Sequence, residues 1–447
     1  MVCAHKYRYV RQPQSGSCGV IFVLRNLDLE GASNNRMALR YHPDRDRLLA
    51  EAHARPSTPL DVPVFATRIA TLGDQDGGAA DRAHLAELCR MSLLPEPPEG
   101  SRWWSFDAGR WTLRWERHTE FSSWTIFGNE PVDGPPTGWL ANLPGEILVR
   151  TTADLKRDEA DGPTPASPRG TSMIGSVVLG GAATIYTDFK PDDGGITRFL
   201  VLVKSVDRVL AGRLALMLLE IETYRLMSLL AFPLAGKAGG QVGAFETETG
   251  ALAARLAEEV GVEADRALLG RLIALSGEAE ALNTQTSYRF RAAAAYYDIV
   301  QDRIATLRET HVPGMQTIGE FMDRRLAPAM RTCDAVAERE AKVIDRIART
   351  GQMLRTRIEI EAEATSAALL KSMDNRALTQ IRLQRAVEGL SVAAISYYAI
   401  SLLSYPFKAL EHSYPKFDAV LATGLLAPVV ILGVWLALRR LRRQGDD

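Results

Sequence analysis

Short apolar runs alternate with polar residues through the first half of the chain, with the period of two that is typical of β-strands. Runs rich in β-branched residues are bounded there by Gly, Pro and Asp, which favour turns. A short helix is expected at residues 44–54, ended by the pair Arg55 and Pro56. The pattern predicts a strand-rich first half. The expected strands lie at residues 62–72, 111–127, 145–151, 172–179, 183–188 and 197–204.

From Asp207 onward the apolar residues recur at helical spacing instead. An amphipathic helix is expected from there to about Phe232. Good helix formers predict further helices at residues 251–259, 263–275 and 287–310. Helices should therefore dominate the second half.

The longest expected helix begins at Ala329 and ends at Leu390, because this stretch holds no proline. A helix of roughly 60 residues would be about 90 Å long at 1.5 Å per residue. Apolar residues recur inside it at heptad-like spacing, which predicts packing against another helix of the same chain or of a second copy. These residues are Ile344, Ile347, Leu354 and Ile358.

Two stretches near the end of the chain, residues 389–407 and 419–438, carry no charged side chain. Each approaches the roughly 20 residues that a helix needs to cross the core of a bilayer. Residues 408–418 between them are polar and include Pro415, as expected for a turn outside the hydrocarbon. The sequence therefore predicts an α+β fold: a strand-rich N-terminal half, a long-helix C-terminal half and a two-span transmembrane helical hairpin.

Arginines flank both expected spans, and basic residues near the ends of a span are retained on the cytoplasmic side. Both chain ends are therefore expected on the cytoplasmic side of the membrane. The flanking residues are Arg376, Arg382 and Arg385 before the first span and Arg439, Arg440, Arg442 and Arg443 after the second. The side chains expected to anchor the spans are Glu388, Tyr405, Trp435, Arg439 and Arg440.

The pattern divides the chain into five expected regions. The first mixes Gly, Ser and Asn with basic residues, and regular pattern begins only after Met37. The regions are an extension that is disordered or precedes the true start (1–36), an α+β cytoplasmic domain (37–206), a helical domain with a long stalk helix (207–385), the two transmembrane helices (386–438) and a basic cytoplasmic tail (439–447).

Composition excludes one class of partner and leaves the chemistry open. The 53 Lys and Arg residues nearly balance the 54 Asp and Glu residues, so the formal net charge is -1. A nucleic-acid binder needs a strong positive field, and none is expected here. The four cysteines have no metal-binding spacing and are expected to be ordinary thiols.

One group of side chains could hold a divalent metal ion. Glu116, His118 and Glu120 would lie on one face if residues 111–127 form one strand, and His53 could add a second imidazole. A solvated polar strand face needs no metal, and the spacing matches no standard metal motif. Phosphate-loop, dinucleotide-binding, zinc-protease and hydrolase-elbow motifs are also missing from the sequence. No cofactor is assigned.

Five segments in a fixed order resemble the bacterial family catalogued as domain of unknown function 3422. The resemblance covers the chain from Tyr41 to its end and implies a bacterial membrane-anchored protein without implying an activity. The segments are Glu51–Pro56, Glu116–Ser123, Gly212 and Arg213 with Glu220–Arg225, Arg324–Cys333, and Val387–Ser391 leading to Tyr397 and Tyr398.

Three functions remain open from the sequence. The first is a non-enzymatic, membrane-tethered scaffold or interaction protein, with the lipid bilayer and a second copy of the chain as expected partners. The second is an oligomeric two-span ion channel or transporter, because the order of elements resembles the CorA type of magnesium channel. That family ends its first span with Gly-Met-Asn, whereas residues 404–407 here read Ser-Tyr-Pro-Phe. The third is a metal-dependent enzyme that uses His53, His118 and Glu120.

Overall fold

The structure is a computed structural model that describes residues 41–45, 48–49, 58–73, 78–131, 133–159, 172–258, 261–413 and 418–443. Contacts divide the chain into two units, residues 1–56 and 57–447. In the first unit the Leu48 amide donates to the Asp44 carbonyl at 2.8 Å. Residues 46–47 and 50–54 of the expected helix at 44–54, and the whole extension 1–36, lie outside the described residues. The division of residues 37–447 into four regions stays a prediction.

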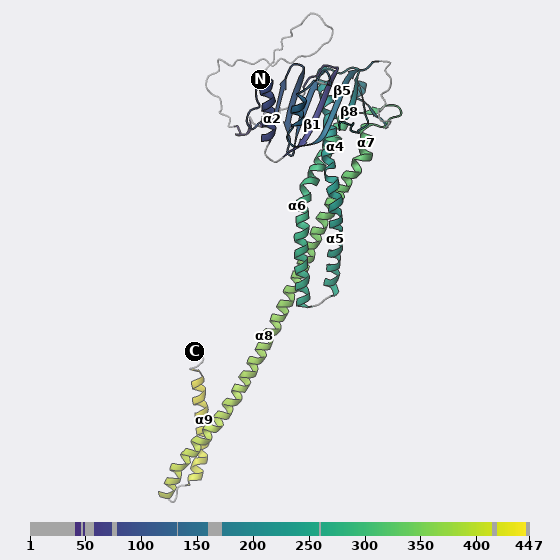
Figure 1. Ribbon diagram of the computed structural model, residues 1–447. Coiled ribbons are helices and arrows are strands. Elements are labelled where there is room, and N and C mark those ends of the chain that lie inside the picture. Colours follow the sequence, from purple (N-terminus) through teal and green to yellow (C-terminus); the bar gives the residue numbers. More distant parts are fainter. Residues whose placement is uncertain are drawn as a thin grey trace, which may run out of the picture. The chain divides into compact units, whose positions relative to one another are not determined.

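Nine strands of the described part of the chain form one sheet in the order β2-β3-β4-β1-β5-β8-β7-β6-β9 (Figure 1). The β5–β8 pair is parallel, and the other paired neighbours are antiparallel. The strands are β1 (Val64–Leu72), β2 (Trp103–Asp107), β3 (Trp111–Arg117), β4 (Phe121–Gly128), β5 (Glu146–Arg157), β6 (Ile174–Val178), β7 (Ala183–Thr187), β8 (Thr197–Val203) and β9 (Thr310–His311).

The expected strands are confirmed at β1, β5, β6, β7 and β8, but the single strand expected at residues 111–127 is wrong. It is a hairpin, because β3 ends at Arg117 and β4 begins at Phe121. A backbone hydrogen bond of 2.9 Å from the His118 amide to the Phe121 carbonyl closes the turn. The turn holds neither Gly nor Pro, so the alternating pattern runs through it without the usual signal of a break.

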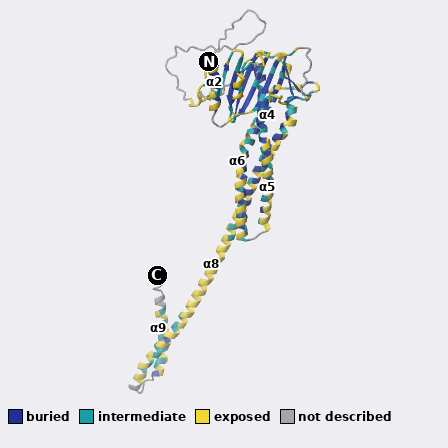
Figure 2. Ribbon diagram, in the orientation of Figure 1, coloured by how far each residue is buried: buried dark blue, intermediate teal, exposed yellow. Residues whose placement is uncertain are grey.

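The two faces of the sheet are covered by different helices. On one face, helix α2 (Ala79–Met91) packs over Trp115 and Trp124, which are fully buried, and α3 (Thr137–Ala141) adds Trp139 to the same cluster. On the other face, helix α4 (Arg208–Leu229) packs against β1 and β5. The strands between these layers are largely buried (Figure 2).

Gly212 permits a close approach between α4 and the segment that precedes β1. An added Cβ at this position would stand 1.9 Å from the Thr58 carbonyl oxygen. Backbone cannot move aside as a flexible side chain can, so the contact requires a residue without a Cβ.

We expect Gly212→Ala to destabilise the protein by about 1–3 kcal/mol, since the added methyl forces the backbone apart. Gly236→Ala is the matched control, because it lies in the next helix with open space around its Cβ position. That change should be neutral or stabilise by up to about 1 kcal/mol. Thermal unfolding of both variants measures the difference. Equal melting temperatures for the two variants would contradict the role given to Gly212.

Long helices α5 (Ala231–Glu258), α6 (Val262–Leu307) and α8 (Ala327–Ser413) pack together, with α4 against α6 and the short α7 (Ile318–Arg325) against α8. Helix α5 begins before the expected 251–259, because its glycines and Pro233 near its start do not interrupt it. The two separate helices expected at 263–275 and 287–310 are wrong, because α6 is one continuous helix over both. At the far end of this bundle the Arg357 guanidinium donates to the Leu256 carbonyl at 2.7 Å and pairs with buried Asp265 at 3.1 Å.

The expected long helix is confirmed and runs further in both directions. Helix α8 has 87 residues and contains Pro406 near its end. It extends to Ser413, so the first part of the expected polar turn at 408–418 is helical; residues 414–417 lie outside the described part. Helix α9 (Ala419–Arg443) then packs against α8. The C-terminal part of α8 and residues Ala419–Leu438 are long and apolar enough to cross a membrane.

Candidate functional site

A row of buried polar side chains crosses the sheet on the face that α4 covers. Strand register aligns Arg114 with Thr125, Thr125 with Arg68, Arg68 with Thr151, and Thr151 with Thr197. All five residues are buried. Polar groups under a helix are costly to bury without partners, so this row is the candidate functional site.

Two arginines of this row share one carboxylate. The Glu116 side chain accepts from Arg114 at 2.7 Å and lies 3.8 Å from Arg68, whose Nε donates to Thr125 at 2.9 Å. Burial raises the pKa of Glu116, but the positive charges of Arg68 and Arg114 outweigh burial and hold that pKa below its usual value. Glu116 is therefore ionised at neutral pH and neutralises part of the buried positive charge.

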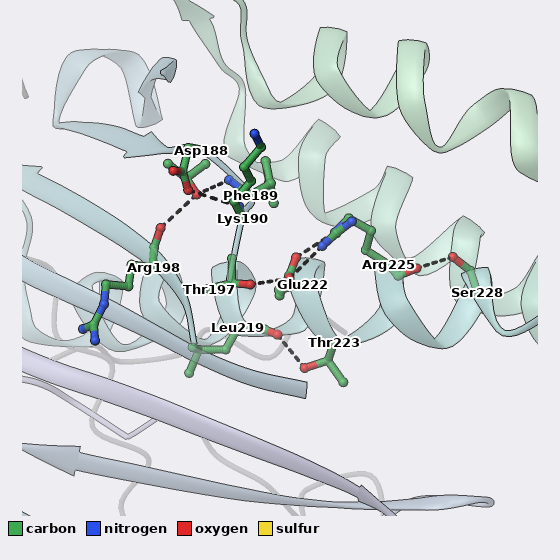
Figure 3. Close-up of polar contacts among 11 residues, drawn as sticks. Asp188, Phe189, Lys190, Thr197, Arg198, Leu219, Glu222, Thr223, Arg225 and Ser228 are labelled. Carbon is green, nitrogen blue, oxygen red and sulfur yellow. Dashed lines mark hydrogen bonds and ion pairs between the residues drawn. The ribbon is translucent and has the colours of Figure 1, made fainter. Parts of the chain in front are cut away.

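A second buried carboxylate connects the far end of the row to α4. The Glu222 side chain is fully buried, accepts from the Thr197 hydroxyl at 2.9 Å and binds Arg225 through two hydrogen bonds of 2.7 and 2.8 Å (Figure 3). The Arg225 guanidinium lies 5.4 Å from the centre of the Phe189 ring, which stacks on Phe321 of α7. This chain of contacts joins β8, α4 and α7.

The turn between β3 and β4 docks on the helices through a third group. The Glu120 carboxylate pairs with Arg289 of α6 at 2.7 Å. Burial, together with the nearby Glu120 carboxylate, raises the pKa of Tyr296. The His118 ring stacks on Phe121 with 4.1 Å between ring centres, and Phe121 meets Tyr224 and Tyr296 edge-on. The turn is thus held against both α4 and α6.

The first of these groups joins strands β1, β3 and β4, and the other two bind the sheet to helices. Each acidic side chain in them has an arginine partner, and each group joins residues of different elements. Buried charges that are paired in this way fix the relative position of the elements they join. They are poorly suited to act as a free acid or base. The arrangement therefore couples the sheet to helices α4, α6 and α7.

The structure separates the side chains expected to bind a metal. Glu116 lies in β3, whereas His118 and Glu120 lie in the turn after β3, so the expectation of one strand face is wrong. His118 contacts Ser123 and Phe121, while Glu120 binds Arg289. Among the described residues no three His, Cys, Asp or Glu side chains are close enough to hold an ion. His53 lies outside them, so metal binding stays a prediction.

The expected membrane anchors lie on the two apolar helices. Tyr405 on α8 and Trp435 on α9 are exposed, Glu388 is partly buried on α8, and Arg440 is exposed on α9. The backbone of Arg439 is helical, and its side chain lies outside the described part. These positions are compatible with the expected anchoring roles.

Sequence reasoning missed Arg68, Glu222 and Arg289 as partners of the site. Arg68 is the one charged residue of strand β1, and Glu222 lies among the buried, mostly apolar residues of α4. A charged residue at a position predicted to be buried is the signal that could have found both. Arg289 gave no such signal, because it lies on a helix with many exposed charges.

The fold and the site define an α+β protein in which a mixed sheet is tied to a long-helix bundle that continues into two helices able to span a membrane. The family model described as "Protein of unknown function (DUF3422)" matches residues 40–445, so the chain belongs to this family. The resemblance seen in the sequence is confirmed. Comparison with curated proteins and comparison with solved structures gave no match.

Proposed function

We propose that the protein is a non-enzymatic scaffold of the bacterial inner membrane that displays its sheet and bundle to cytoplasmic partners. The observation that supports this proposal is the continuity of α8. Helix α8 is continuous over 87 residues. Its first part carries the buried stripe that packs in the bundle, and its last part is the apolar segment that packs against α9. A single rigid element would then tie the sheet-and-bundle part to the bilayer.

The flanking charges support the orientation. Arg382 and Arg385 precede the first apolar stretch, and Arg440 is an exposed residue near the end of α9. Basic residues near span ends remain on the cytoplasmic side, so both chain ends and the sheet would lie in the cytoplasm. The residues that connect α8 with α9 would lie outside.

Membrane attachment has a direct test. The full-length chain should sediment with membranes, resist a carbonate wash and dissolve in detergent. Changing Val429 and Leu432 of α9 to arginine should weaken insertion, since a charge at the centre of a span costs about 2.5–3.5 kcal/mol. Changing Leu370 and Leu378 of α8, which lie outside both apolar stretches, to arginine is the matched control. Full-length protein in the supernatant without detergent would refute the proposal.

The scaffold role needs its own measurement. Crosslinking in intact cells, followed by purification of the full-length chain in detergent, should recover a cytoplasmic partner in fixed ratio. Glu120→Gln, which removes the ion pair between the β3–β4 turn and Arg289 of α6, should lower the recovery of that partner. Repeated purification of the chain alone after crosslinking would count against a scaffold.

A two-span ion channel is the second candidate, favoured by the order of elements. A sheet domain, the α5–α6 pair, a long helix, a short connector and a second apolar helix follow one another, as in channels of the CorA type. Pro406 lies where that family has its Gly-Met-Asn element. Shared topology is weak support for transport. Each chain supplies a single first span, so a pore lined by this span needs several chains. The oligomeric state of the purified protein in detergent therefore tests the channel: a monomer would rule it out.

A further inference from the structure

Helix α8 loses its packing partners where the α5–α6 pair ends. Up to Leu354 the helix has a buried stripe, and Arg357 marks the end of the bundle through its contacts with Leu256 and Asp265. Residues 362–387 are all exposed, and no described part of the chain covers them. Most helical stability in proteins comes from packing of one face, so 26 consecutive residues of uncovered helix call for a partner.

One face of this segment holds mostly neutral side chains, and Arg376 is the charged residue at its border. The neutral positions recur at spacings of three, four or seven residues, as on the contact face of paired helices. We call this face the α8 seam; its main members are Ala362, Leu369, Met373, Ala377, Gln380 and Val387. Arg376 lies seven residues after Leu369 and borders the seam. The other charged residues of the segment lie elsewhere around the helix; they are Glu363, Lys371, Asp374, Arg382 and Arg385.

The α8 seam continues an established interface. Ile347 and Leu354 belong to the buried stripe that packs within the bundle, and Ile358 is packed against the same core. Spacing of three or four residues leads from Ile358 to Ala362 and on along the seam. The side chains of Leu369, Met373 and Val387 are 62%, 58% and 57% exposed, so the apolar part of the seam is uncovered.

We infer that the α8 seam binds the seam of a second copy of this chain, with the two helices parallel and in register. The orientation rests on the proposed membrane anchorage, which gives every copy the same direction and the same height above the bilayer. Identical residues then meet across a two-fold axis, as in a parallel two-stranded coiled coil. The seam positions themselves are neutral, so at these symmetric contacts like charges meet only at the border, where Arg376 of each copy lies.

Disulfide crosslinking of the full-length chain in membranes tests this inference. Met373→Cys and Leu369→Cys place single thiols on the seam, and Lys371→Cys and Arg382→Cys place them on the opposite face of the same helix. Cys3 and Cys18 are first changed to serine, while Cys89 and Cys333 are buried and stay. After mild oxidation the seam variants should form a species of twice the chain mass several-fold more than the opposite-face variants.

Three results would overturn the inference: no doubled species from either seam variant, equal amounts from both faces, or a crosslinked species whose mass shows a different protein. Each variant is also divided into membrane and supernatant fractions before oxidation. A chain that fails to sediment contradicts the membrane anchorage, whereas the yield of doubled species in either fraction still decides the seam contact. The two failures are therefore distinguishable.

Discussion

Glu116→Gln is expected to destabilise the protein by about 3–5 kcal/mol, because it removes the negative charge of the buried carboxylate that Arg68 and Arg114 share. The glutamine keeps the size of the side chain, so the loss reflects charge and not a cavity. Unfolding in urea, followed by tryptophan fluorescence from Trp115 and Trp124 on the opposite sheet face, measures the change. Glu146→Gln at an exposed strand position is the control and should change stability by less than about 0.5 kcal/mol.

The same variant should have a characteristic pH dependence. The pKa of Glu116 is lower in the folded protein than in the unfolded chain, where it is about 4.3. Its stabilising contribution is therefore complete above that value and is lost as the pH falls through the folded pKa. The stability gap between wild type and Glu116→Gln should be full at pH 7 and shrink in acid below about pH 4. A gap that widens in acid would contradict the assigned pairing.

Glu222→Ala is expected to cost about 3 kcal/mol, since it removes the fully buried partner of Arg225 and of the Thr197 hydroxyl. Adding Arg225→Met should restore part of this loss, because removing both charges of a buried pair is less costly than removing one. Melting temperatures of the two single variants and the double variant form the cycle that isolates the pair.

Glu220→Ala is the matched control on the same helix. Glu220 is partly exposed and pairs with Arg303 near the surface, so its loss should cost no more than about 1 kcal/mol. If Glu220→Ala proved as costly as Glu222→Ala, the special position of Glu222 under the sheet would be refuted.

The sequence predicted elements well where their pattern is local. The strands at β1, β5, β6, β7 and β8 and the uninterrupted course of α8 follow from period and from the positions of proline. The β3–β4 turn could not be found in this way, because residues 118–120 carry no turn former and keep the strand alternation. Strand β2 and helix α2 were also missed. Helix α2 has Gly78 before it and a mixed face of Asp81, Arg82 and Leu85, so its amphipathic signal is weak.

The site depends on strand order, which the sequence does not reveal. Arg68, Thr125 and Thr151 belong to strands far apart in the chain and meet only because β1 lies between β4 and β5. The sequence identified Glu116 as a candidate metal ligand. In the fold it is the buried counterion of Arg68 and Arg114. Pairing partners of a charged residue are fixed by register, and register is a property of the folded sheet.

The lack of any break in α8 constrains the number of residues between the end of the bundle and the apolar stretch. Each residue adds about 100° of turn, so losing one residue from positions 362–387 would swing everything after it around the helix axis by that angle. Losing seven residues would restore the phase to within about 20° and draw the two ends closer by about 10 Å. Insertions and deletions here should therefore be tolerated at lengths near a whole number of turns, such as seven, eleven or eighteen residues, and resisted at lengths that change the phase.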